Sequence, residues 1–210
     1  MQSALTVEEI ERLTREKFDT NKSIILIFSP YNGEENGPNF DFLRRVTDYH
    51  FHSGQGLDCY CVGYSLYEPE PNRQMGRSVR LSDDFGWPLT YFYPENFHQI
   101  RTFVQRKLNG RWRYNGGVDA ILFSASGDDL APVNWHRAAC VSSRVHVNNA
   151  FQDVDHMLRT IMNLNEEFDG GILPEQLDPE IARRRLIEGA KRLAGEAAGA
   201  AISGAITLIG

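Results

Sequence analysis

The stretch Ser23-Ile-Ile-Leu-Ile-Phe28 decides the fold, because it is short, apolar at every residue after the serine, and rich in β-branched side chains. A continuous apolar run of this length, rather than an alternating one, is typical of a strand that is buried on both faces. Such strands lie inside parallel sheets that helices cover on both sides. The stretch therefore predicts a central strand of an α/β domain.

The residues that follow this strand predict a β-α-β unit. Residues 29–39 form a turn-rich loop, and Asn39 is placed to begin a helix that runs to about His52. Residues 57–67 form the next β-rich run and predict a second strand. Strands joined by a crossover of this kind are parallel. We therefore expect the strands 23–28 and 57–67 to be parallel.

The second half of the domain predicts a helix, a hairpin and a closing helix. Pro94 begins a helix that ends near Asn109. Strands are predicted over 118–126 and 138–147, and the connection between them is short enough for an antiparallel hairpin. A helix over 149–166 closes the domain. The sheet is therefore expected to be mixed, with parallel and antiparallel pairs.

Three weaker elements complete the prediction. A first helix over 6–18 begins at Thr6, with Glu9 as its capping-box partner. Short strands are expected near 78–81 and 89–93, within and after a loop region that is rich in proline and charge.

This order of elements resembles the thioredoxin-like arrangement, in which a β-α-β unit is followed by a helix, a β-hairpin and a closing helix. Other α/β folds with mixed strand pairing fit the order nearly as well. Thioredoxins carry Cys-x-x-Cys after the first strand, where this chain has Ser29-Pro-Tyr-Asn-Gly33. The resemblance therefore concerns topology and implies no redox dithiol.

Length and composition indicate one folded domain with an appendage. The chain has 210 residues, of which 41% are hydrophobic and 24% are charged, as in ordinary globular proteins. We expect an α/β domain over 1–169, a linker over 170–179 and a separate C-terminal helix over 180–210. The net charge of −6 argues against a nucleic-acid partner, because such binding depends on clustered Lys and Arg.

The cysteine count and the N-terminal residues predict a cytoplasmic protein. Cys59, Cys61 and Cys140 are odd in number and show no disulfide spacing. The first residues are acidic and amphipathic, which is unlike a secretory signal.

The C-terminal segment has an unusual composition. Gly or Ala occupies 12 of the 22 positions from Gly189 onward, and no residue from Ala197 to Gly210 is charged. Small residues recur four apart, and on a helix this spacing forms a flat strip that a second helix can approach closely. The candidate self-association or membrane residues are Gly195, Gly199, Ala201, Gly204 and Ala205.

A membrane is the other candidate partner of this segment. The charge-free run has 14 residues, whereas a bilayer core needs about 20, so a simple span is not expected. The basic residues Arg183, Arg184 and Arg185 would suit an anionic membrane surface. Packing on the parent domain or on a second copy and a disordered tail are the alternatives.

Four carboxylates could serve a metal-dependent hydrolase. Glu34 and Glu35 follow the first predicted strand, and Glu68 and Glu70 follow the second. Parallel strands place such loops at one edge of the sheet, where α/β proteins bind ligands. Carboxylate oxygens suit Mg²⁺, and no other cofactor is predicted. The alternative is that these are ordinary loop carboxylates of an acidic protein.

Two further sets of side chains are candidates for catalysis. His50 could act with Cys61 as a nucleophile pair, although a thiol inside a strand is most often buried and inert. Asp128 could act with His136 as an acid–base pair, although an Asp at a hairpin most simply stabilises the turn.

No catalytic motif stands out, so the leading hypothesis is a non-enzymatic binding or sensor module. Its C-terminal segment would mediate self-association or membrane engagement, as in an effector. The alternatives are the metal-dependent hydrolase and a subunit of a stable hetero-complex.

Overall fold

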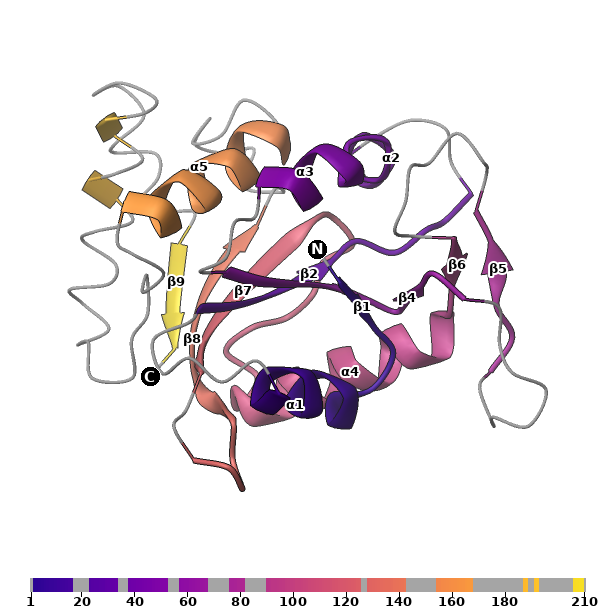
Figure 1. Ribbon diagram of the computed structural model, residues 1–210, viewed down its shortest axis with the longest axis horizontal. Helices are drawn as coiled ribbons and strands as arrows, with labels where there is room; N and C mark the ends of the chain where they lie inside the picture. The colour runs from indigo at the N-terminus through magenta and orange to yellow at the C-terminus, as the bar shows by residue number, and fades with distance from the viewer. Residues whose placement is uncertain are drawn as a thin grey trace.

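The computed structural model describes most of the α/β domain and short pieces of the C-terminal segment. The described residues are 2–16, 23–33, 38–52, 57–67, 76–81, 90–125, 128–142, 154–167, 187–188, 191–192 and 206–209. Within them the chain forms a mixed α/β fold with one large sheet and one small sheet (Figure 1).

The large sheet has the strand order β1-β3-β2-β7-β8-β9 among the described residues. Its strands are β1 (Gln2–Ala4), β2 (Ser23–Phe28), β3 (Leu57–Val62), β7 (Asp119–Ala125), β8 (Val133–Ser142) and β9 (Ile206–Ile209). The strands β1 and β2 pair with β3 in parallel, and β7, β8 and β9 follow in antiparallel pairs. The predicted mixed sheet and the predicted central strand 23–28 are confirmed, since every residue of β2 is buried.

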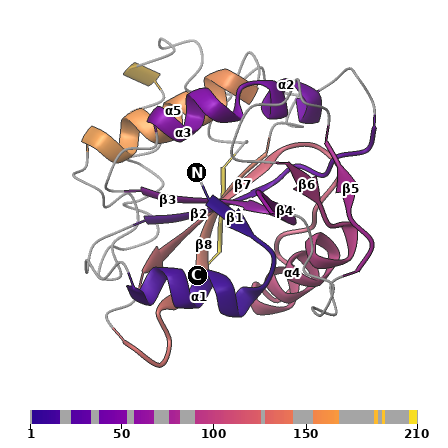
Figure 2. The ribbon, with the colours of Figure 1, turned by 45° about the vertical axis from the view of Figure 1, so that its right-hand side comes forward.

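Helices cover both faces of this sheet, as a fully buried central strand requires. The helices α1 (Val7–Glu16) and α4 (Pro94–Lys107) lie on one face. The helices α2 (Pro38–Arg44), α3 (Val46–His52) and α5 (Val154–Glu167) lie on the other, and both views agree on this arrangement (Figures 1 and 2).

The predicted strand 57–67 divides at Gly63 instead of continuing. Gly63 has φ of 81°, a left-handed conformation that glycine adopts without strain, and it turns the chain from β3 into β4 (Tyr64–Ser65). A Cβ on Gly63 would lie 2.7 Å from Cβ of Phe97 on α4. Beyond this turn β4 joins a small antiparallel sheet with β6 (Tyr91–Phe92) and β5 (Val79–Arg80), which confirms the two short strands.

Two predicted boundaries differ from the structure. The predicted helix 39–52 is divided into two helices. The backbone amide of Arg45 donates a hydrogen bond to the carbonyl of Phe42, three residues earlier, and this turn separates the two helices. The second strand of the hairpin begins at Val133 rather than at 138, because a register shift between Phe123 and Ala125 lets the pairing continue to Val133. The N-terminal capping box is confirmed, since Thr6 Oγ1 accepts a hydrogen bond from the amide of Glu9.

The prediction of a helix over 180–210 is wrong at its C-terminal end. Residues 187–188 and 191–192 are helical, but Ile206–Ile209 form the strand β9 beside β8. The run Ile-Thr-Leu-Ile is β-branched and apolar, so it favours a strand where a sheet edge offers backbone partners. Ile187 packs against the domain core. None of the helices in the described ranges has the length and apolar character needed to cross a bilayer.

An ion-pair network joins the helices on one face of the sheet. Asp155 of α5 accepts hydrogen bonds from Tyr49 (3.1 Å) and Arg159 (2.9 Å), and it pairs with Arg45 at 2.9 Å. Partial burial raises the pKa of the Asp155 carboxyl, but the hydrogen bonds from Arg159 and Tyr49 and the two positive charges lower it below its ordinary value. The network therefore stabilises the contact between α3 and α5 in the ionised form.

Replacing Asp155 with Asn should lower the free energy of unfolding at pH 7 by about 1 kcal/mol, because these partly exposed contacts lose their charge. A carboxyl whose pKa is lowered on folding contributes stability above its unfolded pKa and loses it as the pH falls through the folded value. The difference between wild type and Asp155→Asn should therefore shrink below the ordinary Asp pKa of 3.8. Urea unfolding across this pH range measures it, and a difference independent of pH would contradict the ionic account.

Candidate functional site

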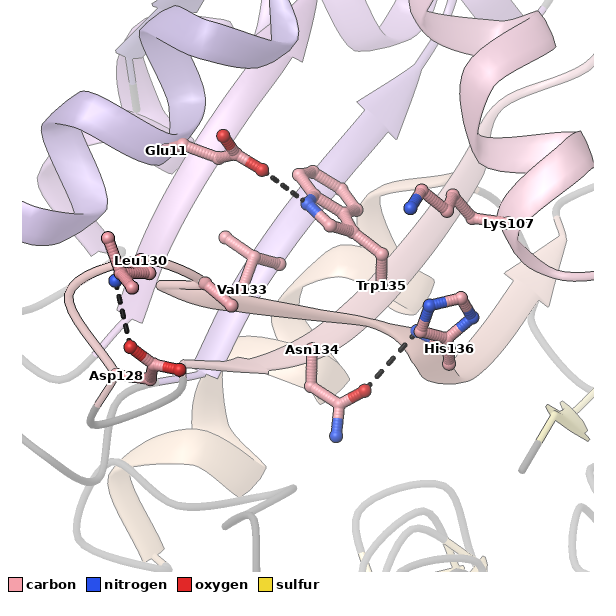
Figure 3. A pocket seen from close by; sticks show the side chains of 9 residues that line it. Glu11, Lys107, Asp128, Leu130, Val133, Asn134, Trp135 and His136 are labelled. Atoms are coloured by element: carbon pink, nitrogen blue, oxygen red, sulfur yellow. Dashed lines mark hydrogen bonds between the residues drawn. The ribbon is translucent and has the colours of Figure 1, made fainter.

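A pocket of about 430 Å³ lies where α1, α4 and the β7–β8 hairpin meet (Figure 3). We call it the hairpin pocket. The residues that line it are Glu11, Lys107, Asp128, Leu130, Ala131, Val133, Asn134, Trp135 and His136.

Trp135 fixes the inner wall of the hairpin pocket. Its indole Nε1 donates a hydrogen bond of 2.8 Å to Glu11 Oε1 on α1. Its ring lies edge-on to Phe103 of α4 at 5.2 Å and to Phe123 of β7 at 5.1 Å. Aromatic pairs in this geometry contribute about 0.5–1.5 kcal/mol beyond their buried area. The wall is therefore held by two helices and a neighbouring strand at once.

The hairpin turn forms the outer rim. Asp128 Oδ1 accepts a hydrogen bond of 2.8 Å from the amide of Leu130, and the carbonyl of Asp128 accepts one from Ala131. Arg15 of α1 donates to the carbonyl of Asp129 at 2.8 Å. This turn leaves Leu130 92% exposed at the edge of the pocket. A large apolar side chain is thus held toward solvent by a turn with defined hydrogen bonds.

The structure brings Asp128 and His136 to the same pocket but not into a pair. Figure 3 shows them at opposite ends, with the Asp128 carboxylate bonded to the turn amide of Leu130. The backbone amide of His136 donates to Asn134 Oδ1 at 3.3 Å, and the residue is exposed. Asp128 therefore has the turn-stabilising role that its position in the sequence also allowed.

The thiol candidate Cys61 is enclosed in the core. Cys59 and Cys61 lie in β3 and are at most 1% exposed, and burial raises the pKa of each thiol to about 12. A thiol with such a pKa holds almost no nucleophilic thiolate at neutral pH. Its proposed partner His50 lies in α3, and the side chain of that histidine falls outside the described part.

The acidic edge is described only in part. The premise that β2 and β3 are parallel neighbours is confirmed by their register, from Ser23 opposite Leu57 to Ile27 opposite Cys61. Glu34, Glu35, Glu68 and Glu70 all lie outside the described residues. Among the side chains that the structure does describe, no three His, Cys, Asp or Glu residues converge as metal ligands would.

Aromatic side chains fill the described portion of this edge. The hydroxyl of Tyr64 donates to the carbonyl of Ser29 at 2.6 Å, directly after β2. The indole of Trp112 donates to the buried carboxylate of Asp119 at 2.9 Å, and its ring lies 4.7 Å from that of Phe28. These contacts close the end of β2 with packed rings.

The small-residue candidates lie outside the described residues as well. These are Gly195, Gly199, Ala201, Gly204 and Ala205. The self-association that their spacing predicts stays a prediction.

Sequence reasoning found Asp128 and His136 but missed the residues that build the pocket around them. Glu11 is one of several acidic residues early in α1, and only the packing of α1 against β8 singles it out. Lys107 ends α4, where its ammonium group lies 5.4 Å from the ring centre of Phe103. The sequence did offer a signal for the wall of the pocket, namely a tryptophan that lies between the polar residues Asn134 and His136.

Comparisons with protein-family models, with curated proteins and with solved structures found no match for this chain. Its function is therefore inferred from its own residues.

Replacing Trp135 with Phe should lower the free energy of unfolding by about 1 kcal/mol, because the ring contacts largely remain while the bond to Glu11 is lost. Urea unfolding measures this change. Glu11→Gln keeps an acceptor oxygen and is the matched control, so it should cost less. Equal stability of Trp135→Phe and wild type would show that the bond does not hold α1 against the hairpin.

Proposed function

We propose that the protein is a binding module that recognises a protein partner at the hairpin pocket and associates with itself through its C-terminal segment. The observation that carries the first half is the exposed Leu130 beside a hollow whose wall is fixed by Trp135. A hollow with a fixed wall and an apolar residue at its rim favours binding, because little conformational freedom of the wall side chain is lost when a partner docks.

The lining of the pocket favours a peptide segment as the ligand. Leu130, Ala131 and Val133 offer apolar contact along the hairpin, and Asn134 offers an amide. Glu11 and Lys107 add one charge of each sign on the facing helices. A peptide that places an apolar side chain against Leu130, with polar groups beside it, matches this chemistry.

The scaffold that presents this pocket is proposed to be thioredoxin-like in topology. In support, β2, the α2–α3 crossover and β3 form a β-α-β unit, and α4, the β7–β8 hairpin and α5 follow in that order. The loop after β2 begins Ser29-Pro-Tyr-Asn-Gly33 and has no cysteine where thioredoxins carry Cys-x-x-Cys, so a binding role for the scaffold fits better than a dithiol role.

Peptides selected from a random display library on the immobilised full-length protein should bind the Leu130→Asp variant at least tenfold more weakly. A tenfold loss corresponds to about 1.4 kcal/mol, as expected for an anchor residue at an interface. Tyr67→Asp is the matched control, because Tyr67 is also an exposed apolar residue, at 76%, but lies in the turn after β4. Selection of no peptide sensitive to Leu130→Asp would argue against the pocket.

The second half of the proposal concerns the Gly/Ala-rich segment. Its small residues at four-residue spacing favour close contact with the same segment of a second copy. Anionic membranes are the competing partner, because arginines precede the segment.

Light scattering of the full-length chain without lipid should give a mass above 23.9 kDa that falls in the Gly199→Leu variant. The added side chain would hold the two segments apart by its own bulk. Ala200→Leu is the matched control, because at helical spacing Ala200 shares its face with Arg192 and Glu196. A monomeric wild type that co-sediments with anionic vesicles would instead support the membrane alternative.

A further inference from the structure

The strand β9 is an addition to a sheet that is complete without it. Removing β9 would leave the five strands β1-β3-β2-β7-β8 with all their mutual pairings intact. The strand attaches through one neighbour only, with Ala138 opposite Ile209, Ala139 opposite Leu208, Cys140 opposite Thr207 and Val141 opposite Ile206. Figure 1 shows it at the edge of the sheet, beside β8. Nothing in the rest of the described sheet must unfold for β9 to leave.

We infer that the edge of β8 at Ala138–Val141 is the docking surface for the C-terminal strand Ile206–Ile209 of a second copy of this chain. This inference rests on the proposed self-association and names the surface that it uses. Two copies would exchange their last strands, and each β8 would then pair with the partner's β9. Exchange of an identical element keeps every backbone contact of the single chain, so it costs little free energy.

The length of chain between α5 and β9 permits the exchange. Residues 168–205 separate Glu167 from Ile206. Because Ile187 packs against the domain core and 191–192 are helical, the part that must span the gap is 193–205, whose reach when fully extended is at most roughly 45 Å. That distance is comparable to the diameter of a domain of this size, for which the expected radius of gyration is about 15 Å. The segment can therefore reach a neighbouring copy.

The composition of the intervening segment lets the exchanged arrangement compete with the single-chain one. Within a single chain, the tether alone gives β9 an effective concentration near β8 in the millimolar range, which an intermolecular strand must match. The Gly/Ala-rich residues 189–205 supply the additional contact, because two copies held together by them bring each β9 as close to the partner's β8 as to its own. The uncharged residues 197–210 contain no Lys, Glu or Pro that would disfavour pairing with another chain.

The register of β8 and β9 provides a direct test. Thr207→Cys places a thiol directly opposite the native Cys140. Residues opposite each other in an antiparallel pair have Cβ atoms about 4.5–5.5 Å apart, close enough for a disulfide after a small adjustment. Leu208→Cys is the matched control, because it lies opposite Ala139 and on the other face of the strand. Both variants are oxidised with diamide as full-length proteins at a concentration where light scattering reports the mass.

Thr207→Cys should give a covalent dimer on a non-reducing gel, and Leu208→Cys should give none. A mixture of the Thr207→Cys/Cys140→Ser double variant with wild type should also give the dimer, because its disulfide can form only between chains. An oligomer in solution whose disulfide forms only within a chain, or not at all, would overturn strand exchange and leave self-association standing. A monomer in solution would overturn both.

Discussion

Burial of β2 on both faces is the constraint on which the rest of the structure depends. All six residues of Ser23–Phe28 are buried between the parallel neighbour β3 and the antiparallel neighbour β7. Burial of one large apolar side chain contributes about 1.5–3 kcal/mol, so the strand's five contribute on the order of 10 kcal/mol before chain entropy is counted. That burial requires a helical layer on each face. One layer consists of α1 and α4, and the other consists of α2, α3 and α5.

The positions of these layers determine where the molecule is open. On one face, α1 and α4 lie beside the β7–β8 hairpin, which projects past the helices in Figure 1. Trp135 fills the space between these helices and the hairpin, and its indole donates a hydrogen bond to Glu11. The hairpin pocket is the space that remains beyond the indole ring. At the carboxyl end of β2, by contrast, Tyr64, Trp112 and Phe28 pack closely. The topology alone would have favoured that end as the binding edge.

The sequence predicted the elements whose signals are local, and it failed where a contact between distant residues decides the outcome. The strand β2 could be predicted because its apolar run is continuous, and α1 because Thr6 and Glu9 cap it. The strand β1 is Gln-Ser-Ala, which has no β-forming signal and pairs only because β3 offers a free edge. Gly63 ends β3 because Phe97, 34 positions along the chain, leaves no room for a Cβ. Likewise, only tertiary packing brings Glu11 and Lys107 to Asp128 and His136, so the pocket could not be derived from spacing.

The two proposed surfaces share one strand. Val133 to His136 of β8 line the hairpin pocket, and Ala138 to Val141 of the same strand pair with β9. The register of β8 against β7 shifts between these two parts, since Ala138 lies opposite Phe123 and Val133 lies opposite Ala125. The pocket end of β8 is held mainly by Trp135, which donates a hydrogen bond to Glu11 of α1 and packs on Phe103 of α4. The two surfaces therefore adjoin on one strand but depend on different contacts, the pocket on the helices α1 and α4 and the edge on the pairing of β8 with β9.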